Sequence, residues 1–242
     1  MTPLHYLPFL TTPVSILFAL AVLRRYQQRG GAHLLLWGIG LLLYAAGTFA
    51  EAYLALMWSP FILKLWYLTG AMLTAAWLGQ GTVHLLIRRR GVAVTTSIGL
   101  ALISLIALIG VFTAPLSNVV YNLALPASEQ YKAILIRPGF VTLLTVLLNI
   151  YGSLGLIGGA IWSAWLFWRK HILQHRVIGN VLIAVGALMP ASAGTLIKFG
   201  LADWLYVSEL LGAIIMFVGF LFATSAQTQT KETQPMPVPA GD

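Results

Sequence analysis

The sequence predicts an all-α polytopic membrane protein: a bundle of seven transmembrane helices with its N-terminus outside and its C-terminus in the cytoplasm. Apolar residues make up 59% of the 242 residues and charged residues only 8%, with a mean hydropathy of +0.88. A soluble domain is usually about a quarter charged. The apolar residues also form runs of about 20, long enough to cross a bilayer, and basic residues alternate between the two sides of these runs.

The seven predicted spans use most of the chain, so residues 1–226 are expected to form a single domain. The tail, residues 227–242, is rich in Gln, Thr and Pro, and is predicted to be a disordered cytoplasmic segment. The predicted spans are 6–23, 34–57, 61–87, 92–112, 138–168, 177–199 and 204–224.

Charged and turn-forming residues mark where the spans begin and end. The first span ends at Arg24 and lacks the basic start of a signal peptide, so it is kept as a helix. The second stops at a turn at residues 58–60, and the third ends at the arginines at 88–90. The fifth begins after Pro138, a residue suited to a first helical turn. Pro190 predicts a kink in the sixth span, because it removes a backbone hydrogen bond.

The basic residues fix the predicted direction of the chain. Of fourteen Lys and Arg residues, ten fall on one side of the spans and four on the other, and the richer side of a membrane protein is cytoplasmic. The net charge of +8 therefore indicates orientation rather than nucleic-acid binding. With no cysteine, no glycosylation sequon and short loops, we expect a bacterial plasma (inner) membrane. The cytoplasmic set is Arg24, Arg25, Arg29, Arg88, Arg89, Arg90, Arg169, Lys170, Arg176 and Lys231; the outer set is Lys64, Lys132, Arg137 and Lys198.

Stripes of small residues predict which helix faces meet inside the bundle. Helices in lipid associate where small side chains let the backbones approach. Such stripes, spaced by three or four residues, are Gly40, Tyr44, Gly47 and Glu51 in the second span, Gly155, Gly159 and Ser163 in the fifth, and Ala184, Ala187 and Ala191 in the sixth.

A cluster of charged residues is predicted at one depth near the outer surface. Charges inside a membrane are costly, so they are usually paired or functional. One interpretation is a set of ion pairs, such as Glu51 with Lys64 and Glu209 with Lys198, that hold the outer helix ends together. The other is a polar pocket that binds a small ligand or an ion. The cluster comprises Glu51, Lys64, Tyr67, Arg137, Lys198, Asp203, Tyr206 and Glu209.

Several cofactor and catalytic chemistries lack the residues they need. Retinal would require a lysine in the middle of the last helix, which has none. The histidines near the inner surface, His84 above all, show no metal-ligand spacing. No phosphate-binding loop and no Ser-His-Asp set at a common depth is found. We therefore expect no cofactor, no metal and a non-enzymatic function, with a lipid-modifying membrane enzyme as the weakest alternative.

Two functions remain open from the sequence. The first is a receptor-like protein, sensor or accessory subunit, which would need another membrane protein or a separate cytoplasmic output partner besides the lipid bilayer. The second is a small transporter or channel, which should show polar residues at successive depths below the charged cluster. The residues available for such a path are Thr48, Thr74, Gln80, Asn149 and Asn180.

Overall fold

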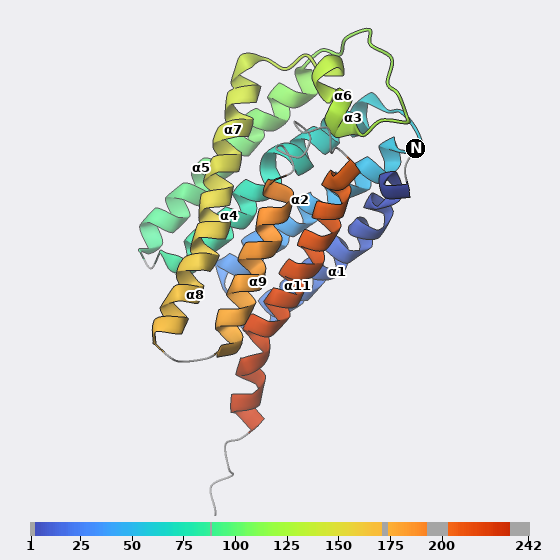
Figure 1. Cartoon of the computed structure of the whole chain (residues 1–242). Coiled ribbons are helices and arrows are strands. Elements are labelled where there is room, and N and C mark those ends of the chain that lie inside the picture. Colours follow the sequence, from blue (N-terminus) through green and yellow to red (C-terminus); the bar gives the residue numbers. More distant parts are fainter. Residues whose placement is uncertain (1–2, 88, 171–173, 193–202, 233–242) are drawn as a thin grey trace, which may run out of the picture.

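The computed structural model describes residues 3–87, 89–170, 174–192 and 203–232, and in these ranges the chain is built from helices without a named strand. The long helices run side by side as one bundle (Figure 1). Two segments, η2 and η3, are π-helical and continue the α-helices on either side of them. The elements are η1 Pro3–Tyr6, α1 Pro8–Arg29, α2 Ala32–Leu54, α3 Pro60–Trp66, η2 Tyr67–Leu73, α4 Thr74–Leu86, α5 Arg90–Thr113, α6 Ala127–Ile134, α7 Gly139–Ser153, η3 Leu154–Gly158, α8 Gly159–Arg169, α9 Gln174–Ala191 and α11 Asp203–Glu232.

The all-α fold class is confirmed in the described chain, and six of its helical stretches are long and apolar enough to cross a membrane. The predicted sixth span, 177–199, corresponds in its first part to α9, which starts with the polar residues Gln174, His175 and Arg176. Residues 193–202 lie outside the described ranges, so the seven-helix count and the N-out direction stay predictions. The six stretches are Leu4–Arg29, Ala32–Leu54, Pro60–Leu86, Gly91–Thr113, Gly139–Arg169 and Trp204–Thr224.

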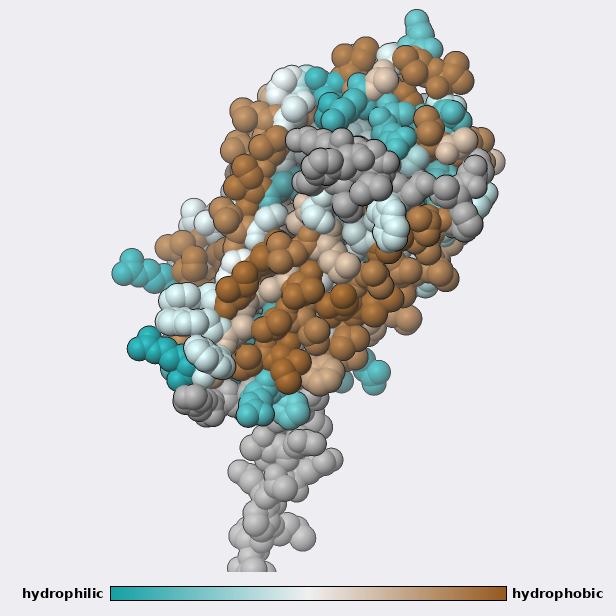
Figure 2. All heavy atoms as spheres, viewed as in Figure 1, coloured by the Kyte–Doolittle hydropathy of each residue, from teal (hydrophilic) through white to brown (hydrophobic). Residues whose placement is uncertain are grey.

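Large apolar side chains cover the outside of the bundle, as expected where lipid is the solvent. On α7 and η3, Leu143, Leu147 and Leu154 are exposed, the last to 71%. Leu102, Leu105 and other large residues of α5 are exposed as well. Figure 2 shows apolar residues over the middle of one face and polar residues towards both ends. Exposed apolar surface of this extent belongs in a bilayer.

Close backbone contacts at glycines hold the helices together. A Cβ atom on Gly79 of α4 would lie 2.7 Å from the carbonyl oxygen of Gly152 on α7, and one on Gly47 of α2 would lie 2.7 Å from Cα of Gly70 in η2. The Gly40-to-Glu51 face of α2, predicted to point inward, is buried, which confirms that prediction. Similar glycine contacts join α9 and α11 through Gly179, Gly186, Gly212 and Gly219.

Two parts of the chain carry helix that was not expected from the sequence. The connection at residues 113–137 contains α6, whose Ala127, Ser128 and Ile134 are buried against the bundle. At the other end of the chain, α11 continues to Glu232, so residues 227–232 of the predicted disordered tail are helical. Residues 233–242 of that tail lie outside the described ranges.

Candidate functional site

A cavity of about 630 Å³ lies between α2, α3, η2, α4, α6, α7, η3, α9 and α11. Both π-helical segments contribute to its wall, through residues such as Gly70 of η2 and Leu154 of η3, and Pro190 of α9 contributes as well. π-helical turns and prolines are the irregularities that break regular helix packing. The cavity therefore lies where three of the surrounding helices depart from regular α-helix.

Two carboxylates line this cavity. Glu51 is only 3% exposed, and its Oε1 accepts a hydrogen bond of 2.8 Å from the indole Nε1 of Trp66. Glu209 also lines the cavity, and the two carboxyl groups interact directly, side chain to side chain. The Oε2 atoms of both are buried without a hydrogen-bond partner in the described part of the chain. Tyr44 ties the two helices together, because its hydroxyl donates to the backbone oxygen of Glu209 at 2.9 Å.

Lys64 does not pair with Glu51. Its Nζ donates a hydrogen bond of 2.8 Å to the backbone oxygen of Phe112, in the last turn of α5. The last carbonyl groups of a helix have no partner within the helix, so a lysine can satisfy them. The structure therefore does not contain the ion pair of Glu51 with Lys64, which was an example of the ion-pair interpretation. Lys64 binds the end of α5 instead.

An aromatic layer lies next to the carboxylates. Trp66 and Tyr131 line the cavity, with ring centroids 5.4 Å apart, and Tyr67 lies behind them, 5.6 Å from Tyr131. Burial raises the pKa of the Tyr131 phenol above its ordinary value, although Arg137 opposes this, so the ring stays neutral at physiological pH. The layer offers neutral aromatic surface beside two acids.

Arg137 lies against the aromatic layer and is not one of the residues that line the cavity. Its guanidinium carbon is 4.8 Å from the centroid of Tyr131 and 5.5 Å from that of Tyr67, and Nη1 donates to the Tyr67 hydroxyl at 3.3 Å. The Tyr67 hydroxyl also lies 2.8 Å from Oγ1 of Thr145. The cation of Arg137 is thereby engaged by the rings, away from the carboxylates.

Of the three remaining members of the predicted cluster, Tyr206 is the one whose side chain the structure describes, and it does not line the cavity. Tyr206 is buried and packs edge-on against the ring of His5, with centroids 5.9 Å apart. Asp203 begins α11, but its side chain is outside the described part of the structure, as is all of Lys198. The pairing of Glu209 with Lys198 stays a prediction.

Uncharged polar groups line the cavity as well. Thr48, Thr74 and Asn149 were named from the sequence as parts of a polar path, and all three line it. The Asn149 amide donates to the backbone oxygen of Ala71 at 2.8 Å, and the Thr74 hydroxyl donates to that of Thr69 at 2.7 Å. Both acceptors belong to η2, so these side chains support its π-helical backbone.

Trp66 and Tyr131 line the cavity and are not in the cluster predicted from the sequence. The indole of Trp66 donates a hydrogen bond to Glu51. Tyr131 falls in a connection with no span signal, and only the short apolar and polar alternation of residues 127–134 could have indicated a helix there. The positions of Trp66 and Tyr131 at the cavity depend on contacts between segments that are distant in the sequence, so the local pattern does not reveal them.

The residues of the cavity favour a positively charged ligand. Two carboxyl groups, three aromatic side chains, hydroxyl groups and an amide line it, and no Lys, Arg or His is among the described lining residues. Within the same described ranges, no group of three metal-binding side chains comes together. No protein-family model, curated protein or solved structure matches this chain.

Proposed function

We propose that this chain is a non-enzymatic, multi-pass membrane protein that binds a small organic cation in the cavity. The observation that carries this proposal is the pair Glu51 and Glu209: two carboxyl groups side by side at a large cavity, with no basic side chain paired to either among the described residues. Charges inside a membrane protein are costly unless they are paired. A bound cation would balance these two groups, beside which the described residues place no basic side chain.

The aromatic layer supports an organic ammonium group as the ligand. A cation within about 6 Å of the centroid of a Trp or Tyr ring is attracted to the ring face, and quaternary ammonium ligands are often bound in this way. The cavity volume of about 630 Å³ suits a small organic molecule. A bare metal ion would need several oxygen ligands at about 2.0–2.6 Å, which is a much tighter site.

The proposed biological role is receptor-like or sensory, in a bacterial inner membrane. With the predicted N-out direction, the ends of α2 and α11 that hold Glu51 and Glu209 lie in the outer part of the bundle, where a ligand from outside can enter. The described chain is taken up by the bundle, so a sensor would pass its signal to a partner protein. Transport would need, in addition, a passage from the cavity to the other end of the bundle.

Binding of radiolabelled tetraethylammonium to the purified protein tests the proposal. We expect saturable binding by the wild type, and at least tenfold weaker binding by Glu51→Gln and by Glu209→Gln, because each change removes one carboxyl group of the pair and keeps the shape of the side chain. A tenfold loss corresponds to about 1.4 kcal/mol. The matched control is Glu129→Gln, which removes an exposed carboxylate of α6 away from the cavity.

The control should bind like the wild type. Equal binding by Glu51→Gln, Glu209→Gln and Glu129→Gln would contradict the proposal, provided that all three show the wild-type elution volume and thermal transition. The absence of saturable binding by the wild type would contradict it as well.

A further inference from the structure

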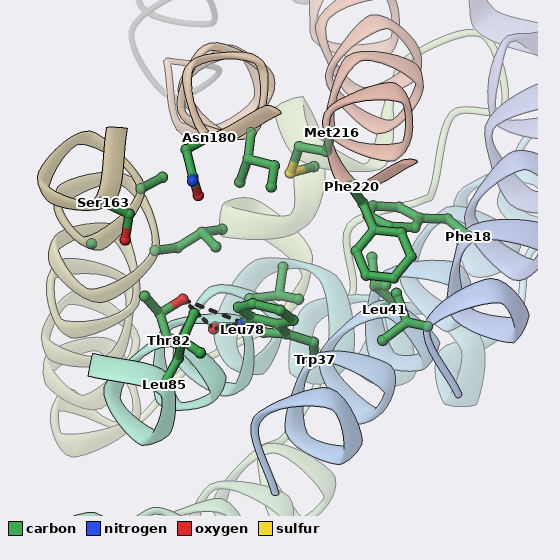
Figure 3. Close-up of a pocket in the computed structure, with 15 residues that line it drawn as sticks. Phe18, Trp37, Leu41, Leu78, Thr82, Leu85, Ser163, Asn180, Met216 and Phe220 are labelled. Carbon is green, nitrogen blue, oxygen red and sulfur yellow. Dashed lines mark hydrogen bonds between the residues drawn. The ribbon is translucent and has the colours of Figure 1, made fainter. Parts of the chain in front are cut away.

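A second, smaller pocket lies between α1, α2, α4, η3, α8, α9 and α11 (Figure 3). Its volume is about 50 Å³, and its wall includes three polar side chains, Thr82, Ser163 and Asn180. Asn180 points into it in Figure 3. Trp37, near the start of α2, and Leu85, near the end of α4, line it too. Since Glu51 is near the end of α2, the cavity and the second pocket occupy opposite halves of the bundle.

The two spaces are separated by one apolar layer. Leu78 of α4, Leu156 of η3 and Met216 of α11 line both the cavity and the second pocket. Leu78 and Met216 are buried and belong to one hydrophobic cluster, against which Leu156 packs. The layer thus has polar groups on both sides and none within it. Closed apolar constrictions stop ions because water leaves them.

We propose that Leu78, Leu156 and Met216 form a closed hydrophobic gate between the cation-binding cavity and a vestibule on the other side, so that the protein moves its cation across the membrane. This inference rests on the proposed function and extends it from binding to transport. Of the five residues that the sequence offered for a polar path, Thr48, Thr74 and Asn149 lie on the cavity side of the gate and Asn180 on the other.

The segments that carry or contact the gate residues contain irregularities at which helices can change shape. Leu156 lies in the π-helical turn η3. One residue of α-helix corresponds to a rotation of about 100°, so a return of η3 to regular α-helix would turn Leu156 away from its present position. Met216 packs on α9, where a Cβ on Gly186 would lie 2.7 Å from its Cγ. Pro190 follows one helical turn later, at a natural hinge.

The gate can be tested with introduced cysteines, because the chain has none of its own. Ser153 lines the cavity and Ser163 lines the second pocket, so Ser153→Cys and Ser163→Cys place one thiol on each side of the layer at little steric cost. The probe is a membrane-impermeant trimethylammonium methanethiosulfonate, added to either side of proteoliposomes that hold the full chain in one orientation. We expect the two thiols to react from opposite sides.

Widening the gate should then change the reactivity of one thiol. In the Leu78→Ala background, Ser163→Cys should react at least tenfold faster from the side that reaches Ser153→Cys. The matched control is Leu100→Ala, a similarly buried leucine of α5 that lines neither space; it should leave the rate unchanged. Met216→Ala repeats the test at another gate position if Leu78→Ala does not fold.

The outcomes test the gate and the cation site independently of each other. An unchanged rate in both gate variants, or reaction of both thiols from the same side in the wild-type background, overturns the gate. Protection of Ser153→Cys by tetraethylammonium reports on the cation site in the same vesicles. Protection without a response to the gate variants leaves the cation site standing and refutes transport through this layer. If tetraethylammonium does not protect Ser153→Cys while the gate variants respond as expected, the cation site is refuted and the gate stands.

Discussion

Replacing Gly152 by alanine is expected to destabilise the folded protein by about 3 kcal/mol or more. The Cβ of the alanine would overlap the backbone of Ala75 and Ala76 on α4. Backbone atoms cannot turn aside as a side chain does, so α4 and α7 must separate, and overpacking of this kind commonly costs 1–3 kcal/mol even where side chains yield. The measurement is thermal unfolding of the purified protein in detergent, followed by circular dichroism and by the fraction that elutes as a single species.

The matched control for this prediction is Gly158→Ala. No atom lies within 4 Å of the position that a Cβ would take on Gly158, and the residue lies only six positions further along the same continuous helix. Alanine is the better helix former, so the control should keep or slightly raise the stability. Similar losses in both variants would show that the glycines matter for backbone conformation and not for the crossing with α4.

The second large effect is expected for Gln80→Leu. Gln80 is fully buried, and its Nε2 lies 2.8–3.1 Å from three acceptors on α5: the backbone oxygen of Ala93, Oγ1 of Thr96 and Oγ of Ser97. Its Oε1 accepts a hydrogen bond from the hydroxyl of Tyr151 on α7. One side chain thus joins α4, α5 and α7.

Leucine keeps the volume of Gln80 but removes all of these bonds and leaves the Tyr151 hydroxyl without its acceptor. A buried group that loses its partner costs about 1–3 kcal/mol, whereas a typical interhelical hydrogen bond in a membrane contributes about 0.6 kcal/mol. We expect a total loss of about 2–4 kcal/mol, measured by the same unfolding assay. Gln28→Leu, at an exposed position of α1, is the control. A loss no larger than that of the control would mean that α5 is held by apolar packing alone.

Gln80 has a different role in the structure from the one that the sequence predicts for it. It was considered for a transport path, because a glutamine at mid-membrane is costly and often functional. In the structure it binds α5 and α7. His84, one turn further along α4, likewise lies 2.7 Å from Oγ of Ser97. Spacing along one helix cannot distinguish a residue that faces a cavity from one that faces a neighbouring helix.

The features that depend on local pattern were predictable from the sequence. Hydropathy located six spans close to where the structure has them, and small-residue spacing identified the buried face of α2 that carries Gly47 and Glu51. A shared depth for Glu51 and Glu209 stays a prediction, made from the number of turns between each residue and a charged or turn-forming boundary. The structure adds that both residues line one cavity.

The features that depend on contacts between helices were not predictable. Whether Lys64 binds Glu51 or the carbonyl of Phe112 is decided by the position of α5, which its sequence does not reveal. The π-helical turns η2 and η3 carry no distinctive residues. Side chains of other helices help to stabilise η2: the Asn149 amide donates a hydrogen bond to the backbone oxygen of Ala71. Both turns contribute to the wall of the cavity, so its size could not be predicted either.

Modification of the carboxyl groups by an apolar carbodiimide, with and without tetraethylammonium, tests the central claim most directly. A bound cation at Glu51 and Glu209 must cover the groups that react. Mass spectrometry of the digested protein then gives the rate at each glutamate, with the exposed Glu129 as the internal reference. We predict that saturating tetraethylammonium slows modification of Glu51 and Glu209 at least fivefold and leaves that of Glu129 unchanged. Equal rates with and without the cation at Glu51 and Glu209 would contradict the cation site.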